Sequence, residues 1–254
     1  MATTDDPLHG TAAIVTGATS GLGRAVALRL AAANAHVALL GRSENDLAAV
    51  AEQVTSHGVR ALPLPTDLAD TEALHQIVNR AADELGPLSV LVNAAATDAP
   101  GPAEQLSLDD WRRVVAVNLT APFALARAVL PHMRRRGTGL IVNISSVAGR
   151  RGWADASAYC ATKFGLTGLT QSLAAEARTD GIRVCVLYPG AMNTNWGTFD
   201  PADRSTGIQH AASGERDSLD PAVVADLIAW MATAPGQPVL NEVTVTPLHE
   251  LGWP

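Results

Sequence analysis

The chain has 254 residues, a formal net charge of -7 at pH 7 and a pI near 5.4. An acidic chain lacks the basic footprint of nucleic-acid-binding proteins, so we expect no nucleic-acid partner. Hydrophobic residues make up 47% and charged residues 17%, which is typical of a globular domain with a substantial core. Two cysteines give no disulfide framework, and the histidines lack zinc-type spacing, so we expect no catalytic metal.

The sequence also argues against membrane insertion and secretion. No apolar run approaches the length of a membrane span, and the polar amino terminus lacks the basic and apolar regions of a signal peptide. We therefore expect a cytoplasmic protein with no membrane partner. Residues 1–9 are expected to form a flexible segment, and residues 10–254 a single domain.

A strand, a glycine turn, a helix and a second strand open the chain. Apolar residues predict strands at 12–16 and 36–40, with an Ala/Leu-rich helix ending near residue 34. The turn contains three glycines, Gly17, Gly21 and Gly23. Glycine permits close approach of the backbone to a phosphate, and the free amides at a helix start favour an anion. A nucleotide-binding turn is predicted, since it has a strand before it and a helix after it.

Arg42 follows the second strand and bears on cofactor choice. At this place dinucleotide-binding folds carry an acid that holds the ribose hydroxyls, or a basic residue that accommodates a 2'-phosphate. The acid is absent here, so Arg42 favours NADP(H), with NAD(H) possible. The alternative is a surface arginine ahead of a helix cap at Ser43.

Helices and strands continue to alternate through the middle of the chain. Helices are expected at 43–56, at 70–85 and from 107, and strands at 60–65, 88–93 and 139–145. Asp67 closes the third strand, where its carboxylate can accept a hydrogen bond from an adenine amino group or cap a turn. The alternation predicts an α/β fold, a Rossmann-like doubly wound parallel sheet of about seven strands with helices on both faces.

Several polar residues mark the expected helices. Asp70, Ser107 and Asp220 are predicted to cap helix starts. Asn118 lies among apolar neighbours, so burial would oblige its amide to find hydrogen-bond partners. Pro122 is expected to bend the same helix.

Lys163 is the single lysine beside 17 arginines, and it lies four residues after Tyr159. Apolar residues recurring from 166 to 177 predict a helix on which the phenol and the ammonium share a face. A nearby cation favours phenolate, which suits a tyrosine to acid–base work near neutral pH. Ser146 ends an apolar run, so its hydroxyl would emerge at a strand's carboxyl end. The alternative is a surface Tyr–Lys pair and a turn serine.

The carboxyl-terminal part contains one long irregular stretch. After a strand expected at 182–187, residues 191–219 are polar and lack periodicity. Loops of this length in compact domains are often functional lids, and we expect a substrate lid here. Trp153 and Trp196 offer apolar surface to a substrate, although loop aromatics equally serve packing. A last strand is expected at 242–245.

Together these motifs resemble the short-chain dehydrogenase/reductase family across essentially the whole chain. The residues that match the family's catalytic positions are Asn118, Ser146, Tyr159 and Lys163. The candidate cofactor-binding residues are Thr16, Gly17, Ser20, Gly21, Leu22, Gly23, Arg42, Asp67, Leu68, Asn93, Tyr159, Lys163, Pro189, Gly190, Met192 and Thr194. The candidate substrate contacts are Ser146, Tyr159, Trp153 and Trp196.

The resemblance implies hydride transfer between a nicotinamide and a carbonyl carbon of a small molecule. Ser146 would orient the carbonyl oxygen, and Tyr159 would give or take the proton. Lys163 would lower the phenol pKa and hold the nicotinamide ribose, while Asn118 would bind a water linking Lys163 to solvent. A homotetramer or homodimer is also implied.

Two departures from the family pattern qualify this hypothesis. The family's NNAG is Asn93-Ala94-Ala95-Ala96 here, and alanine fits only where the backbone avoids positive φ. The carboxyl end lacks the Asp-Gly-Gly ending common among the family's acyl-carrier-protein reductases. We predict an NADP(H)-dependent ketoreductase or secondary-alcohol dehydrogenase. The alternatives are an NAD-dependent enzyme of the same family and a non-catalytic dinucleotide-binding regulatory protein.

Overall fold

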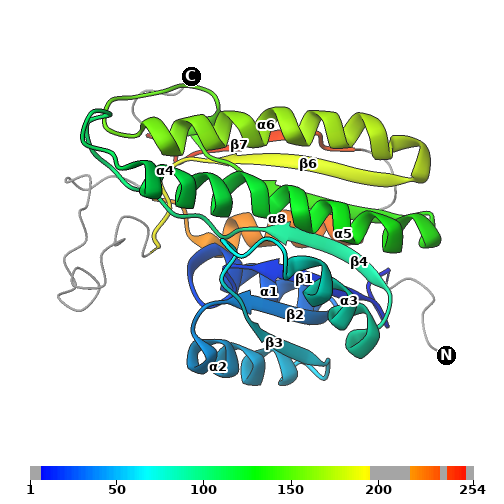
Figure 1. Cartoon of the computed structure of the whole chain (residues 1–254). Coiled ribbons are helices and arrows are strands. Elements are labelled where there is room, and N and C mark those ends of the chain that lie inside the picture. The colour runs from blue at the N-terminus through cyan, green and yellow to red at the C-terminus, as the bar shows by residue number, and fades with distance from the viewer. Residues whose placement is uncertain (1–6, 195–217, 235–238, 250–254) are drawn as a thin grey trace.

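A parallel β-sheet of seven strands forms the centre of the protein in this computed structural model, which describes residues 7–194, 218–234 and 239–249 (Figure 1). The strands are β1 (Ala12–Thr16), β2 (His36–Gly41), β3 (Ala61–Pro65), β4 (Leu88–Asn93), β5 (Gly139–Ile144), β6 (Ile182–Pro189) and β7 (Glu242–Val245). They lie in the order β3-β2-β1-β4-β5-β6-β7, and every neighbouring pair is parallel. The predicted doubly wound α/β fold is confirmed.

Helices cover both faces of this sheet. The α-helices are α1 (Gly21–Ala32), α2 (Glu44–Thr55), α3 (Leu74–Leu85), α4 (Leu108–Val115), α5 (Ala121–Arg136), α6 (Ser157–Ala177) and α8 (Pro221–Thr233). Shorter turns are the π-helical η1 (Ala116–Thr120) and the 3-10 turns η2 (Val147–Gly149) and η3 (Arg178–Asp180). Helices α1, α2 and α8 pack on one face, and α3, α5 and α6 on the other.

Strand β1 shows why both faces are covered. All five of its residues are buried, with Ala13 and Val15 in one core and Ala12 and Ile14 in the other. Full burial of a side chain such as that of Ile14 stabilises the fold by about 1.5–3 kcal/mol. A strand buried on both faces needs an uninterrupted apolar sequence, which is the pattern that predicted this strand.

Helix starts follow the predicted caps with one exception. The side chains of Ser43, Ser107 and Asp220 each accept a hydrogen bond from a backbone N–H in the first turn of their helix. The prediction that Asp70 caps a helix is wrong, because α3 begins at Leu74. The backbone N–H of Asp70 instead closes the preceding turn, so this acid belongs to the loop after β3.

Helices α4 and α5 are joined through the π-helical turn η1 into one run, Leu108–Arg136. Pro122 lies in the first turn of α5, where its missing N–H is tolerated, and the π-helical turn η1 directly precedes α5; the bend expected at Pro122 stays a prediction. By length and composition alone the run could cross a membrane, which the sequence patterns did not predict. However, 56% of its most apolar window is buried inside the protein, as in the core helix of a globular domain.

The described residues bear on both ends of the predicted domain. Leu8 is 2% exposed and packs in the core, so the packed structure includes part of the segment that we expected to be flexible. Residues 195–217, most of the expected lid, lie outside the described residues. The flanking residues meet, since backbone hydrogen bonds of 2.9 Å join Leu219 to Ala191 and to Asn193.

Candidate active site

The carboxyl ends of the central strands bring the candidate residues to one edge of the sheet. Gly17 follows β1, Ala94 follows β4, Ser146 lies two residues beyond β5, and Gly190 follows β6. The strand order reverses between β1 and β4. In open parallel sheets, the crevice at such a reversal is the usual place for a ligand.

The glycine turn between β1 and α1 is closely packed. Gly17 has φ of +66°, and a Cβ there would lie 3.0 Å from the Cα of Ala95. A Cβ on Gly23 would overlap the backbone carbonyl of Gly17. Side chains are therefore excluded from both positions. The start of α1 follows this tight turn, and the free amides of a helix start favour an anion.

Thr16 joins this turn to the neighbouring loop after β4. Its Oγ1 accepts hydrogen bonds from the backbone N–H groups of Ala94 and Ala95, each 3.0 Å long. None of the three alanines 94–96 has a positive φ. The alanine at position 96, where the family has glycine, is therefore free of backbone strain. The requirement that the backbone avoid positive φ there is met.

The carboxylate of Asp67, in the loop after β3, lies near three residues that affect its charge. The Asp67 carboxylate accepts a 3.0 Å hydrogen bond from the N–H of Ala69, and this bond is the main reason why its pKa is lowered. Arg113 of α4 pairs with the same carboxylate at 3.3 Å. The exposed Arg42 lies close enough for its charge to lower the Asp67 pKa as well. Leu68 is buried beside them.

The segment after β6 returns to the glycine turn. The N–H of Gly190 donates to the carbonyl of Val245 in β7, and Met192 packs against the core. Thr194 lies against Gly21, since a Cβ on that glycine would be 3.2 Å from the threonine methyl. Two candidate cofactor-binding segments that are far apart in sequence are thereby adjacent.

Ser146 and Tyr159 lie together at the end of β5. Ser146 Oγ accepts from the N–H of Ala148 at 3.1 Å and caps η2. Tyr159, in the first turn of α6, is 8% exposed. Burial raises its pKa above the ordinary value near 10, and this outweighs the lowering caused by a hydrogen bond with the Ser146 side chain. The charges of Asp98 and Cys160 raise it further. This direction is opposite to the one predicted from the Tyr–Lys spacing.

Lys163 lies one helical turn after Tyr159 and is 2% exposed. Its Nζ donates a 2.8 Å hydrogen bond to the carbonyl of Ile144 and lies 5.4 Å from the centre of the Tyr159 ring. Burial lowers the Lys163 pKa to about 7, while the charge of Asp98 acts in the opposite direction. The pair is therefore buried, and the surface alternative is wrong.

Asn118 lies in the π-helical turn η1 and is 1% exposed. Its Oδ1 accepts from the N–H of Thr97, and its Nδ2 donates to the carbonyl of Thr97 and to Oγ1 of Thr162. The side chain thus has the partners that burial requires. Its backbone carbonyl receives no hydrogen bond from residue 122, four positions on, because Pro122 has no N–H.

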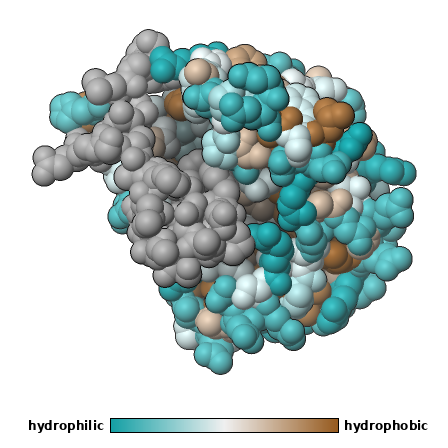
Figure 2. Space-filling model, turned by 60° about the vertical axis from the view of Figure 1, so that its left-hand side comes forward, coloured by the Kyte–Doolittle hydropathy of each residue, from teal (hydrophilic) through white to brown (hydrophobic). Residues whose placement is uncertain are grey.

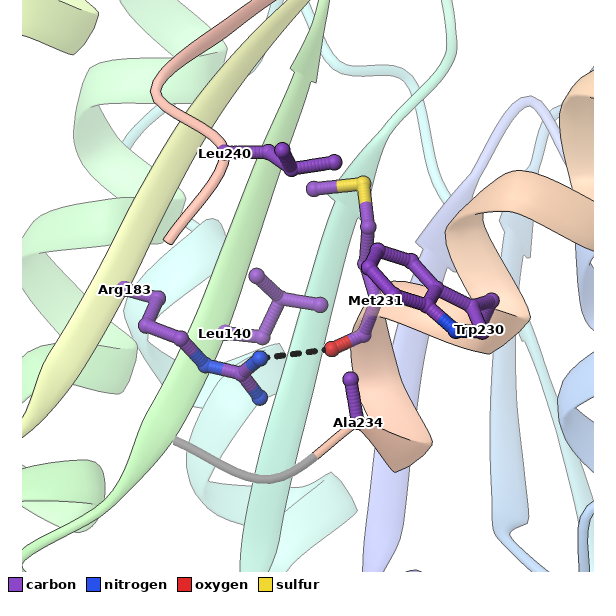
Figure 3. A pocket seen from close by; sticks show the side chains of 6 residues that line it. All are labelled: Leu140, Arg183, Trp230, Met231, Ala234 and Leu240. Atoms are coloured by element: carbon purple, nitrogen blue, oxygen red, sulfur yellow. Dashed lines mark hydrogen bonds between the residues drawn. The ribbon is translucent and has the colours of Figure 1, made fainter. Parts of the chain in front are cut away.

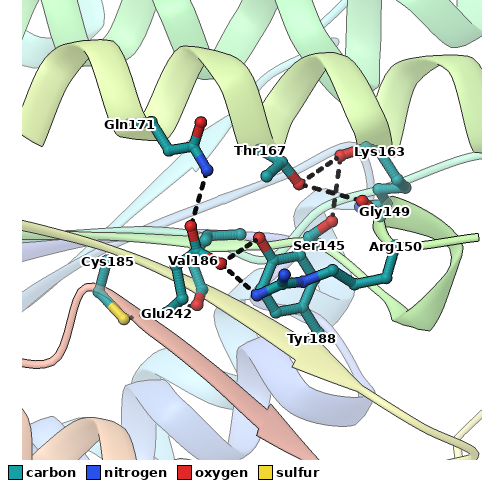
Figure 4. A network of polar contacts seen from close by, with 10 residues as sticks. All are labelled: Ser145, Gly149, Arg150, Lys163, Thr167, Gln171, Cys185, Val186, Tyr188 and Glu242. Carbon is teal, nitrogen blue, oxygen red and sulfur yellow. Dashed lines mark hydrogen bonds and ion pairs between the residues drawn. The ribbon is translucent and has the colours of Figure 1, made fainter. Parts of the chain in front are cut away.

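A polar network holds the loop that follows Ser146 (Figure 4). Glu242 of β7 pairs with Arg150 and accepts hydrogen bonds from Tyr188 at 3.2 Å and from Gln171 at 2.7 Å. The guanidinium of Arg150 also lies 4.3 Å from the centre of the Tyr188 ring. These contacts fix the loop against β6 and β7.

The predicted substrate contacts are only partly placed. Trp153 lies in the loop before α6 and is 44% exposed, so its ring is open to a ligand or a partner. Trp196 lies outside the described residues. Among the residues that the structure describes, no three His, Cys, Asp or Glu side chains group as metal ligands.

A surface pocket at the other end of the strands is a poorer candidate for an active site. It lies near the amino ends of β5 and β6, where Arg183 donates a 2.7 Å hydrogen bond to the carbonyl of Met231 (Figure 3). The remaining lining residues are Leu140, Trp230, Ala234 and Leu240. This lining offers no acid, base or nucleophile for a reaction.

A comparison with known protein families shows which family the chain belongs to. The short chain dehydrogenase family matches residues 11–204 of the chain. The chain belongs to the short-chain dehydrogenase/reductase family. Membership makes it an oxidoreductase of the NAD(P)-dependent type, and the family resemblance noted in the sequence is confirmed.

Individual relatives agree with this assignment. A short chain dehydrogenase of Pseudocercospora fijiensis is 38% identical over 80% of this chain, which spans just under two thirds (66%) of that protein. Cis-4-hydroxycyclohexanecarboxylate dehydrogenase of Sinomonas cyclohexanicum is 38% identical over 87% of this chain and 88% of its own. A metagenomic short-chain oxidoreductase solved in complex with NADP is 33% identical, with a TM-score of 0.81 over 95% of this chain and 98% of that one.

Sequence reasoning missed three residues that border the site of this family member. Arg113 reaches Asp67 from a helix 46 positions away in sequence, and Thr97 and Asp98 lie beside catalytic candidates in the loop after β4. No local pattern marks them, although Asp98 is an acid just beyond a strand end, where such residues often act on ligands.

Proposed function

We propose that this chain reduces a carbonyl group of a small molecule with NADPH, using Tyr159 as the proton donor. The observation that carries the proposal is the hydrogen bonding between the Ser146 and Tyr159 side chains beside the buried Lys163. This cluster lies at the sheet edge that also carries the glycine turn at Gly17.

The residues around the glycine turn fit a dinucleotide. Gly17 and Gly23 allow the turn to pack closely on the loop after β4, and the start of α1 offers free amides to a diphosphate. The exposed guanidinium of Arg42 suits a 2'-phosphate, because arginine binds phosphate through a planar fork of donors. Bound there, NADPH would supply the hydride. The NADP complex of a structural relative supports this choice, and NAD(H) is the alternative.

The chain's own residues suit the reductive direction. Burial keeps the phenol of Tyr159 protonated at neutral pH, so it can donate a proton to a carbonyl oxygen. Ser146 would orient that oxygen with its hydroxyl. Lys163 would place a positive charge beside the phenol and hold the ribose, and Asn118 would hold the water of a proton relay.

The relatives and the surroundings of the site support a substrate class. The names of two relatives, cis-4-hydroxycyclohexanecarboxylate dehydrogenase and ketoacyl reductase, describe action on a hydroxy acid and on a ketoacyl group. We propose a ketone or secondary alcohol for this chain, contacted by Ser146, Tyr159, Trp153 and Trp196. An apolar portion of the substrate would pack on the exposed ring of Trp153.

Exposed apolar side chains support assembly into a homodimer or homotetramer. Leu108, Trp111, Phe123 and Phe164 are 68%, 37%, 47% and 46% exposed on α4, α5 and α6. On the face drawn in Figure 2, apolar side chains lie among polar ones. The helices beginning after Ser107 and at Ser157 are therefore the proposed interface. The cytoplasmic location and the lack of membrane and nucleic-acid partners stay predictions from the sequence.

A fluorescence titration with NADPH and, separately, NADH tests the proposal. We expect tighter binding of NADPH, and we expect Arg42→Ala to weaken NADPH binding about tenfold, the effect of losing roughly 1.4 kcal/mol, with NADH unchanged. Arg151→Ala, at an exposed arginine of another loop, is the matched control. Equal loss for both cofactors would contradict the role of Arg42. Binding without turnover of any carbonyl would favour a non-catalytic regulatory protein.

A further inference from the structure

The buried ammonium of Lys163 needs a compensating charge. The side chain is 2% exposed, and its Nζ donates a hydrogen bond to the uncharged carbonyl of Ile144. A buried lysine without an opposite charge loses its proton rather than remain ionised. For Lys163 to serve the proposed reaction as a cation, a negative charge must act on it.

Asp98 lies in the loop after β4, and three hydrogen bonds fix that loop beside the catalytic candidates. The backbone of the preceding residue, Thr97, is clamped on both sides by Asn118, with two bonds of 2.8 Å. Further on, the N–H of Gly101 donates to the carbonyl of Asp155 at 2.8 Å, close to the start of α6. The half-buried carboxylate itself accepts from the N–H of Ala99 at 2.8 Å.

Asn118 connects this loop directly to the lysine's helix. Its Nδ2 also donates to Oγ1 of Thr162, the residue before Lys163, at 3.2 Å. Thr162 in turn donates to the carbonyl of Tyr159 at 2.9 Å. The loop that carries Asp98 and the helix that carries the pair are therefore held by one set of hydrogen bonds.

The charges on the two sides act on each other. The Asp98 carboxylate raises the pKa of Lys163, and the lysine lowers the pKa of Asp98 against the raising effect of burial. Asp98 and the Cys160 thiol also raise the pKa of Tyr159, while the Ser146 hydroxyl lowers it. In the described ranges, Asp98 is the charged group that acts on the pKa of the lysine.

We propose that Asp98 is a positioning residue of the catalytic centre, and that its carboxylate keeps the buried ammonium of Lys163 charged. The inference deepens the proposed function, because a charged lysine is what the reaction needs beside Tyr159. Asp98 acts through the lysine, so no contact with substrate is required.

The single lysine of the chain makes a direct test possible. Protein grown with lysine isotopically labelled at its ε-carbon gives one lysine signal, whose shift is followed by NMR from acid to alkaline pH. We expect a midpoint near pH 7 for the wild type. Asp98→Asn keeps an acceptor for the N–H of Ala99 but lacks the charge, and it should lower the midpoint by about one pH unit. Asp98→Glu should restore it.

Matched variants separate this role from general effects. Asp226→Asn removes an exposed acid that pairs with Arg29 on the other side of the protein, and it should leave the midpoint unchanged. If Asp98→Asn fails to fold, Asp98→Ser, whose hydroxyl can also accept from Ala99, replaces it. An unchanged or raised midpoint in the neutral variant would overturn the proposal.

The test does not depend on turnover, so the two proposals can fail separately. A lowered midpoint in a protein that reduces no carbonyl would keep the role of Asp98 and reject the proposed function. In an active enzyme, the alkaline limit of kcat for carbonyl reduction should move to lower pH with the lysine midpoint. If the pH dependence of kcat stays unchanged while the lysine midpoint moves, the link between Asp98 and catalysis is rejected.

Discussion

The side-chain amide of Asn118 makes two hydrogen bonds to the backbone of Thr97, each 2.8 Å long. One side chain of a π-helical turn thereby satisfies both the N–H and the carbonyl of a residue in the loop after β4, which a backbone partner would otherwise do. Because the same amide reaches Thr162, one buried side chain aligns two segments of the active site. Family position predicted that Asn118 matters, but not that it has this structural task.

Replacing Asn118 should therefore destabilise the protein as well as impair catalysis. Asn118→Ala leaves the N–H and the carbonyl of Thr97 without their partner, and we expect the free energy of unfolding to fall by about 3 kcal/mol. Denaturant unfolding measures this loss. Asn45→Ala, at an exposed position of α2, should change stability by less than about 0.5 kcal/mol. Equal stability of the two variants would show that the bonds to Thr97 contribute little.

The hydroxyl of Thr16 should be required for cofactor binding. Thr16→Val keeps the side-chain shape but removes the acceptor shared by the N–H groups of Ala94 and Ala95. We expect NADPH to bind about tenfold more weakly, because the loop beside the glycine turn loses two hydrogen bonds, roughly 1.4 kcal/mol of binding. Thr16→Ser retains the hydroxyl and should bind nearly as the wild type does. Fluorescence titration distinguishes the two, and equal affinities would contradict the role of the hydroxyl.

Removing the phenol hydroxyl of Tyr159 should abolish turnover without loss of cofactor. We expect Tyr159→Phe to lower kcat for carbonyl reduction by about 10²–10⁴, the range attributed to general acid catalysis. The affinity for NADPH should stay within about threefold of the wild type, since the ring is retained. Steady-state kinetics and titration on the same preparation provide the measurement. Substantial residual turnover would mean that another group donates the proton.

Stability should depend on pH through Lys163. Its pKa is lowered to about 7 in the folded protein, against about 10.4 in an unfolded chain. Between these values the unfolded chain binds more protons at this residue, so its contribution to stability rises with pH, by up to about 1.4 kcal/mol per unit.

The variant Lys163→Met isolates this contribution, because other titrating groups, including the buried thiol of Cys185, are common to both proteins. We compare the free energy of unfolding of the variant with that of the wild type at each pH. The difference should favour the variant more near pH 7 than near pH 10. Urea unfolding at several pH values gives the difference. A difference that is constant with pH would contradict a lowered lysine pKa.

The sequence by itself determined most of the elements and the candidate catalytic residues. Buried parallel strands read as unbroken apolar runs, and caps such as Ser107 act within one turn, so both are local properties. The four-residue spacing of Tyr159 and Lys163 likewise fixes a common helix face without any knowledge of the fold. Family resemblance then followed from motifs in the correct order.

Only the tertiary structure decided which groups act on one another and in which direction. Arg113 pairs with Asp67 across 46 positions, and the charge of Asp98 acts on Lys163 across 65 positions of sequence, the difference between 163 and 98. The raised pKa of Tyr159 depends on how completely the fold removes the phenol from water. Desolvation and charge separation are properties of the packed molecule, and no local pattern carries them.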